Sequence, residues 1–91
     1  NKVLHKAQLS KGGITGTLVD VRIVMKQALE LGAVAIILAH NHPSGTLRPS
    51  AADKQITQKI KTASETLDIK VLDHLIITQK SYYSFADENM L

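Results

Sequence analysis

The sequence predicts an α/β fold, a mixed β-sheet sandwiched by helices. Two segments, which begin at Asp20 and Ser50, repeat apolar residues at the spacing of a helix that buries one face. Between them, residues 33–39 form a continuous apolar run, which is typical of a strand covered on both faces. Further strand-like segments complete the order β-α-β-α-β-β, and this order indicates a sheet with helices packed on it.

The first half of the chain contains one predicted strand and one predicted helix. Residues 3–9 alternate loosely between apolar and polar and predict a strand, and a flexible loop around Gly12 and Gly13 follows. Asp20 is suited to cap the next helix, which Gly32 then ends. The buried face of this helix is predicted to contain Val21, Val24, Met25, Ala28 and Leu29.

Three more strands are predicted after this helix. The apolar run 33–39 is too short for a typical helix after a glycine and is expected to be a strand. Residues 43–49 contain prolines and a glycine and predict a loop. Residues 70–78 predict a further strand, residues 79–81 a turn, and residues 82–86 the last strand.

The second helix is predicted to begin at Ser50. Ser50 and Asp53 have the S-x-x-D spacing of a capping box, and Asp is also favoured at the positive end of a helix. The buried face is predicted to contain Ile56, Ile60, Ala63 and Leu67, and the outward face Lys54, Lys61 and Glu65.

The composition describes one small domain, residues 1–91, with 44% apolar residues and a formal net charge of +3. The absence of cysteine excludes disulfides and thiolate metal sites. Since no apolar run approaches the ~18–20 residues of a membrane span and no signal peptide is found, we expect a soluble cytoplasmic protein without membrane contact.

The sequence begins at Asn1 without Met. We therefore expect a fragment that lacks an N-terminal helix and strand region and self-associates through exposed apolar surface.

Two histidines follow the apolar run 33–39 directly. His40 and His42 are two residues apart, so in an extended chain both imidazoles lie on one face. Asp53 follows eleven residues after His42, in the first turn of the predicted second helix. Two imidazoles and one carboxylate form the three-ligand set of a catalytic zinc site, in which the fourth position is kept for water.

Each of these residues also has an ordinary structural interpretation. A histidine at the end of a strand is often only a polar surface residue, and Ser50 and Asp53 are explained by helix capping. Capping does not exclude metal binding, because a cap fixes the backbone while the carboxylate turns to the ion. From the residues alone, both interpretations stay open.

The order of these residues resembles a known motif. His40-x-His42-Pro43, six residues, Ser50, two residues and Asp53 is similar to the JAMM motif of the JAB/MPN metalloprotease superfamily. The strings HNHPSG, LDIKVLDHLII and YSFADENML resemble its RadC-like branch, whose members are named as bacterial DNA repair proteins. The resemblance covers essentially the whole chain and implies a cytidine-deaminase-like arrangement of αβα layers.

The resemblance also implies a chemistry. His40, His42 and Asp53 match the ligands of one zinc ion, and Ser50 matches the catalytic serine that stabilises the oxyanion of the tetrahedral intermediate. Zinc lowers the pKa of its bound water toward ~7, and the resulting hydroxide attacks an amide carbonyl. The expected function is therefore zinc-dependent hydrolysis of a peptide or isopeptide bond.

The sequence departs from the family pattern in two places. The family's general base is a glutamate, which the resemblance places upstream of Asn1. Glu30 is the one glutamate before the histidines, and it fits a solvated helix surface better than the position of the base. Family members also commonly have Pro-Arg-Glu near the start of the first helix, where this sequence matches only at Arg22.

The hydrolase has one main alternative and two weaker ones. The main alternative is a non-catalytic JAB-fold module that docks DNA or repair and replication proteins, and undiminished binding by a zinc-free variant would support it. A zinc deaminase requires H-x-E and cysteine ligands, which this chain lacks. An H-x-H-x-D-H nuclease is excluded because Ser44 and Gly45 occupy the last two places.

Two smaller features have structural interpretations. Asp73 and His74 are adjacent on a predicted strand and therefore point to opposite faces, so we expect one buried, hydrogen-bonded group and one exposed group. Arg48, Lys54 and Lys61 could form a basic patch near the histidines, but solvated charges on a helix explain them better.

Overall fold

The computed structural model describes residues 20–42 and 45–91, so the predicted strand 3–9 and the loop after it lie outside the described residues. The described residues confirm the α/β class, with two helices and a three-stranded mixed sheet in the order β1-β2-β3. Strand β1 pairs with β2 in parallel, and β2 pairs with β3 antiparallel. The elements are α1 (Val21–Glu30), β1 (Ala35–Asn41), α2 (Ala51–Thr66), β2 (Lys70–Ile77) and β3 (Tyr82–Ser84).

The capping residues confirm where both helices begin. The Asp20 side chain accepts a hydrogen bond from the Arg22 backbone N–H at 2.9 Å and caps α1. Ser50 caps α2 through a complete capping box with Asp53. Gly32 follows the end of α1 with a φ of +64°, a conformation that glycine adopts without strain.

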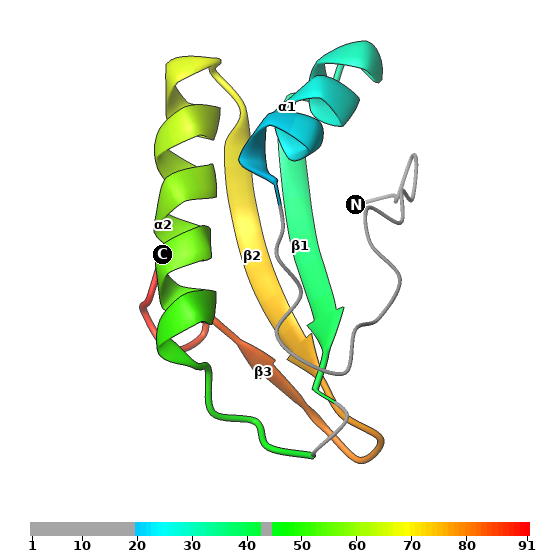
Figure 1. Ribbon diagram of the computed structural model, residues 1–91, viewed down its shortest axis with the longest axis vertical. Coiled ribbons are helices and arrows are strands. Elements are labelled where there is room, and N and C mark those ends of the chain that lie inside the picture. Colours follow the sequence, from blue (N-terminus) through cyan, green and yellow to red (C-terminus); the bar gives the residue numbers. More distant parts are fainter. Residues whose placement is uncertain (1–19, 43–44) are drawn as a thin grey trace.

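The core lies between the two helices and one face of the sheet. Val24 and Met25 of α1 pack with Ile60 of α2 in one buried cluster. Since α1 contacts α2 and α2 contacts β2, both helices cover the same face of the sheet, as Figure 1 shows for α2 running alongside β2. The partly buried apolar residues around this cluster are Val21, Ile36, Leu38, Ile56, Ala63 and Val71.

An irregularity in β2 decides which of its side chains face the helices. Ile36 pairs with Val71, but the next residue of β1 pairs with Asp73, so Leu72 is an extra residue in β2. Leu38 therefore pairs with His74, and His74 points to the helix side while Asp73 points to the opposite side. Without the extra residue, side-chain alternation would place Asp73 on the helix side instead.

Two predicted core positions are wrong. Leu29 is 56% exposed because it lies at the rim of the apolar stripe of α1. Leu67 is 40% exposed because α2 ends at Thr66 and Leu67 is its C-cap. Two polar residues of α2, Thr57 and Ser64, are buried although the sequence did not predict it.

The strand boundaries differ slightly from those predicted. The structure extends β1 through Asn41, so His40 lies within the strand, and β3 ends at Ser84. The expectation that β1 is covered on both faces is wrong for the described residues, because burial alternates along it and Ile37 is 56% exposed.

Among the residues that the structure describes, neither helix is long and apolar enough to cross a membrane.

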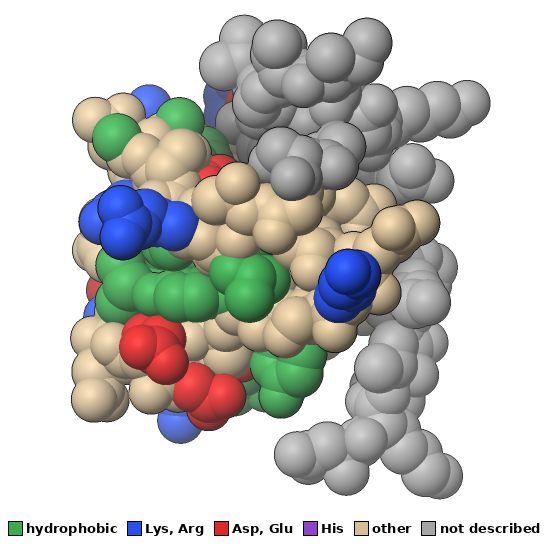
Figure 2. Space-filling view, turned by 90° about the horizontal axis from the view of Figure 1, so that it is seen from below, with side chains coloured by type: hydrophobic (Ala, Val, Ile, Leu, Met, Phe, Trp, Pro, Cys, Tyr) green, Lys and Arg blue, Asp and Glu red, His purple; other side chains and the backbone are tan. Residues whose placement is uncertain are grey.

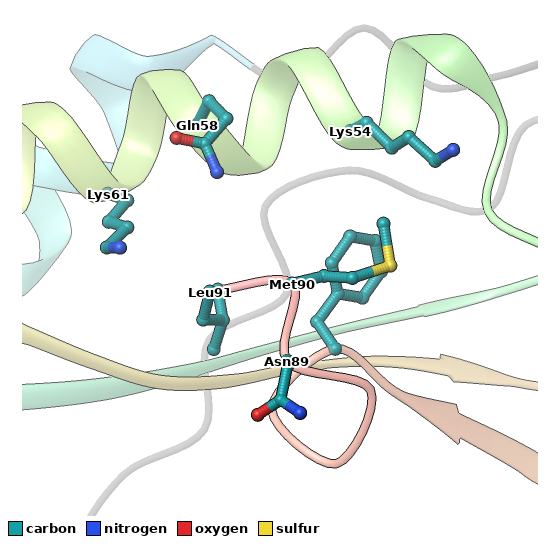
Figure 3. A pocket seen from close by; sticks show the side chains of 7 residues that line it. Lys54, Gln58, Lys61, Asn89, Met90 and Leu91 are labelled. Atoms are coloured by element: carbon teal, nitrogen blue, oxygen red, sulfur yellow. The ribbon is translucent and has the colours of Figure 1, made fainter.

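In the view of Figure 2, the basic residues do not form one continuous surface, because hydrophobic and uncharged surface separates two prominent Lys and Arg groups. Lys54 and Lys61 instead line an open hollow of about 450 Å³ between α2 and the C-terminal segment (Figure 3). The carbon stem of a lysine can lie along apolar surface while its charge stays in water. This arrangement favours the interpretation of solvated helix charges. The remaining lining residues are Gln58, Phe85, Asn89, Met90 and Leu91.

Candidate metal centre

Both histidines are positioned by the carboxyl end of β1. His40 pairs with Ile76, and the backbone N–H of His42 donates to the Ile77 carbonyl at 3.0 Å, which continues the parallel ladder past the strand. Because alternate residues of an extended chain share a face, the two imidazoles lie on the same side, with ring centroids 4.8 Å apart. This end of β1 and the first turn of α2 both lie near the lower end of the molecule in Figure 1.

Asp53 reaches both histidines while it also completes the helix cap. Its backbone N–H donates to Ser50 Oγ at 3.0 Å, and its Oδ2 accepts from the Ser50 backbone N–H at 2.7 Å. The same carboxylate places Oδ1 3.2 Å from His40 Nε2 and Oδ2 3.2 Å from His42 Nε2. The capping interpretation and the ligand interpretation of Asp53 are therefore compatible.

The three side chains converge on one small volume. His40 Nε2 and His42 Nε2 are 3.0 Å apart, and each is 3.2 Å from a carboxylate oxygen of Asp53. In a tetrahedral site with bonds of 2.0–2.1 Å, neighbouring ligand atoms are about 3.3 Å apart. The cluster of His40, His42 and Asp53 could therefore bind a metal ion.

The tautomer of His42 supports this interpretation. Its Nδ1 lies 2.7 Å from the backbone carbonyl oxygen of Thr46, which can only accept a hydrogen bond. Nδ1 must therefore carry the proton, and in the neutral ring Nε2 has a free lone pair that faces Asp53. Metal-binding histidines characteristically have their second nitrogen fixed in this way by a carbonyl or carboxylate.

One neighbour of the cluster was missed from the sequence. His74 is 4% exposed, and its Nε2 lies 2.9 Å from His40 Nδ1. The prediction of one buried, hydrogen-bonded residue in the Asp73–His74 pair is confirmed for His74. Asp73 is not exposed as expected, because it is half-buried and accepts hydrogen bonds from Ser84 Oγ and the Ala86 backbone N–H. The signal that the sequence offered for this contact was a histidine placed within a largely apolar predicted strand.

The comparisons with known proteins identify the family of the chain. The family model described as the RadC-like JAB domain matches residues 1–90. The chain belongs to the RadC-like JAB domain family. It is 70% identical over 90 residues to a UPF0758 protein of Flavobacterium johnsoniae, 50% identical over 91 residues to one of Porphyromonas gingivalis, and 47% identical over 91 residues to the UPF0758 protein YfjY of Escherichia coli.

These relatives are longer proteins. The matches cover 99% of this chain in the first two cases and all of it in the third. They cover 39%, 40% and 57% of the respective relatives. The RadC-like JAB domain of this chain therefore spans about two fifths of the length of the first two relatives.

Ser50 and the glutamates of this RadC-like JAB domain occupy different surroundings. Ser50 is exposed beside Asp53, and its Oγ accepts from the Asp53 backbone N–H, which leaves its own proton uncommitted in that contact. Glu30, Glu65 and Glu88 are all exposed, and none belongs to the cluster of potential ligands in residues 20–42 and 45–91.

Burial favours the neutral forms of His40 and His74. It lowers the pKa of His40 below its ordinary value of 6.5, although the charge of Asp53 opposes this effect. Burial, reinforced by the nearby His40 ring, lowers the pKa of His74 to about 4. Partial burial would raise the pKa of Asp53, but hydrogen bonding to Ser50 and the two histidines outweigh burial and lower it. Neutral imidazoles and an ionised carboxylate are the forms that bind metals.

The metal-free domain is expected to lose stability when the pH falls from about 6.5 to about 4. Unfolded His74 takes up its proton near 6.5 and folded His74 only near 4, so protonation favours the unfolded chain within this window. The expected loss in the free energy of unfolding is on the order of 3 kcal/mol. Urea unfolding across this pH range measures it. The His74→Phe variant should show a shallower pH dependence, and an unchanged slope would contradict the assignment.

Proposed function

We propose that this chain is a zinc-dependent metallohydrolase domain that acts on peptide or isopeptide bonds. The observation that carries the proposal is the convergence of His40 Nε2, His42 Nε2 and the Asp53 carboxylate at distances of 3.0–3.2 Å. Membership of the RadC-like JAB domain family and the JAMM-like order of these residues support it.

The chemistry of the donors favours zinc over magnesium and calcium. Magnesium and calcium prefer sites built from oxygen ligands, whereas two imidazoles and one carboxylate are a set that zinc binds in catalytic sites. Three protein ligands leave one position of a tetrahedral ion open, which distinguishes a catalytic site from a closed structural one. Bound zinc would supply a Lewis acid and a water molecule with a pKa near ~7.

The side chains of the site have separate roles in this proposal. His40 and His42 bind as neutral ligands through Nε2, and the ionised Asp53 offsets the positive charge of the ion. The cap on α2 fixes Asp53, because Ser50 holds both its backbone and its carboxylate. The exposed Ser50 hydroxyl would donate a hydrogen bond to the oxyanion of an attacked amide carbonyl.

The described residues do not supply a general base. The three glutamates of the sequence are all exposed, none of them belongs to the cluster in the described part of the chain, and Asp53 is assigned to the metal. Proton transfer by a positioned base typically contributes 10²–10⁴-fold to a rate. We therefore expect the 91-residue chain to bind zinc and to hydrolyse amide bonds slowly or not at all.

Two measurements on the same preparation test the proposal. Metal analysis after dialysis should find one zinc ion per chain, and a fluorogenic isopeptide assay should find little turnover. The longer Flavobacterium johnsoniae relative, assayed in parallel, is expected to turn over the substrate in a zinc-dependent manner. Absence of zinc binding would refute the hydrolase, and robust turnover by the 91-residue chain would refute the account of the missing base.

The same material distinguishes the binding module. If the chain binds DNA or a repair or replication protein, and His40→Ala abolishes zinc binding without reducing that interaction, the domain acts as a docking module. A hydrolase requires instead that zinc loss and activity loss occur together in the longer protein.

A further inference from the structure

We propose that Thr57 and His74 form a hydrogen-bond chain that fixes the proton of His40 on Nδ1 and thereby turns its Nε2 lone pair toward the metal site. His74 is then a positioning residue, since it touches a ligand and not the ion. This inference rests on the proposed function only for its consequence, metal binding. The hydrogen-bond chain itself is a property of the metal-free protein.

The direction of the chain follows from its buried end. Thr57 Oγ1 lies 2.6 Å from the Asp53 backbone carbonyl oxygen, and this oxygen can only accept. The single hydroxyl proton of Thr57 is therefore donated to Asp53. The same Oγ1 lies 2.5 Å from His74 Nδ1, and since its proton is already committed, it can only accept from that nitrogen. His74 must therefore carry a proton on Nδ1.

The second half of the chain follows from the first. A neutral His74 with its proton on Nδ1 has a lone pair on Nε2, which lies 2.9 Å from His40 Nδ1. His40 Nδ1 must therefore donate, and in the neutral ring His40 Nε2 has the free lone pair. This nitrogen faces Asp53 Oδ1 at 3.2 Å and His42 Nε2 at 3.0 Å. Both histidines of the cluster thus present Nε2 as a ligand atom.

The surroundings of His74 hold its ring in one place. Thr57 is 1% exposed and His74 4% exposed, so neither exchanges its partner freely with water. The Phe85 ring stacks on the His74 ring with centroids 4.6 Å apart and an angle of 12° between the planes. Asp73 of β2 accepts a hydrogen bond from Ser84 Oγ at 2.6 Å, and Ser84 directly precedes Phe85 in the chain. These contacts fix the ring against rotation.

The wrong tautomer of His40 would oppose metal binding. A proton on its Nε2 would point at Asp53 and occupy the lone pair that binds the ion. Partners that orient metal-binding histidines typically change metal affinity 10–100-fold when they are removed. The sequence offers a matched pair of variants. Thr57 and Thr66 both donate from their hydroxyl to a backbone carbonyl four residues earlier in α2, but Thr57 is buried against His74 whereas Thr66 is exposed.

Nitrogen-15 NMR of the metal-free protein at about pH 8, where the rings are neutral, reads the tautomer of each histidine directly. His74 and His40 are expected to carry their protons on Nδ1. Thr57→Val removes the acceptor, so the proton of His74 should move to Nε2 and that of His40 also to Nε2, whereas Thr66→Val should leave both rings unchanged. A wild-type His74 protonated on Nε2, or a Thr57→Val spectrum identical to wild type, would overturn the proposal.

Zinc affinity provides the second measurement. Thr57→Val and His74→Phe are expected to raise the zinc dissociation constant about 10–100-fold. His74→Gln should retain most of the affinity, because its amide oxygen can accept from His40 Nδ1, which a merely structural role does not predict. If the tautomers are as expected but the wild type binds no zinc, the proposed function fails and the hydrogen-bond chain stands. If the wild type binds zinc but the tautomers differ from those expected, the hydrogen-bond chain fails and the proposed function stands.

Discussion

Replacement of His40 by alanine is expected to raise the zinc dissociation constant roughly a hundredfold or more. Structural zinc in zinc-finger peptides contributes about 10–16 kcal/mol of binding free energy through four ligands, so one ligand accounts for about 3 kcal/mol. At about 1.4 kcal/mol per tenfold change, this is about two orders of magnitude. The effect exceeds those expected for Thr57 and His74, because in the proposed site His40 would supply a ligand atom itself, whereas Thr57 and His74 would act through His40.

Isothermal titration with zinc measures this effect, and Asn41→Ala is the matched control. Asn41 lies between His40 and His42 at the end of the same strand, is exposed, and by alternation points to the opposite face of the sheet. Zinc affinity should be unchanged in Asn41→Ala. Equal losses in both variants would show that the strand end, and not the imidazole, is responsible.

The second large effect is expected for Phe85. The Phe85→Ala variant should lower the free energy of unfolding by about 3–5 kcal/mol, the usual range for a buried aromatic residue replaced by alanine. Phe85 is 1% exposed, stacks on His74 and meets the edge of the Tyr83 ring with centroids 5.6 Å apart. Loss of the Phe85 ring removes packing from the core and also removes the ring that stacks on His74 in the hydrogen-bond chain.

Thermal and urea unfolding test this expectation, with Tyr82→Ala as the control. Tyr82 is also aromatic and lies in β3, but it is 60% exposed, so its replacement should cost far less. Zinc at about a hundred times its dissociation constant should restore about 2.7 kcal/mol to any variant that still binds it. A Phe85→Ala protein as stable as wild type would show that the Phe85 ring does not belong to the core.

Local signals predicted much of the fold. The helix starts at Asp20 and Ser50 were visible because a capping side chain acts on backbone N–H groups two or three residues away. The strand that carries His40 was visible because its apolar run is long enough to be distinguished from a loop. The grouping of His40, His42 and Asp53 was predicted from spacing and from the resemblance to a known motif.

Non-local features could not be predicted in the same way. The extra residue Leu72 in β2 arises from the pairing of two strands that are separated by a helix, and no local pattern marks it. Because this irregularity turns His74 toward the helices, the contact between His74 and His40 depends on it. The exposure of Leu67 was missed for a smaller reason, since α2 ends one residue before it.

We propose that His40, His42 and Asp53 together hold one zinc ion. X-ray absorption spectroscopy at the zinc edge of the zinc-loaded protein tests it most directly. The spectrum should show a shell of nitrogen and oxygen atoms at about 2.0–2.1 Å with the outer-shell scattering of two imidazoles, reduced to one in His40→Ala. A spectrum without imidazole scattering, or one that His40→Ala leaves unchanged, would contradict it.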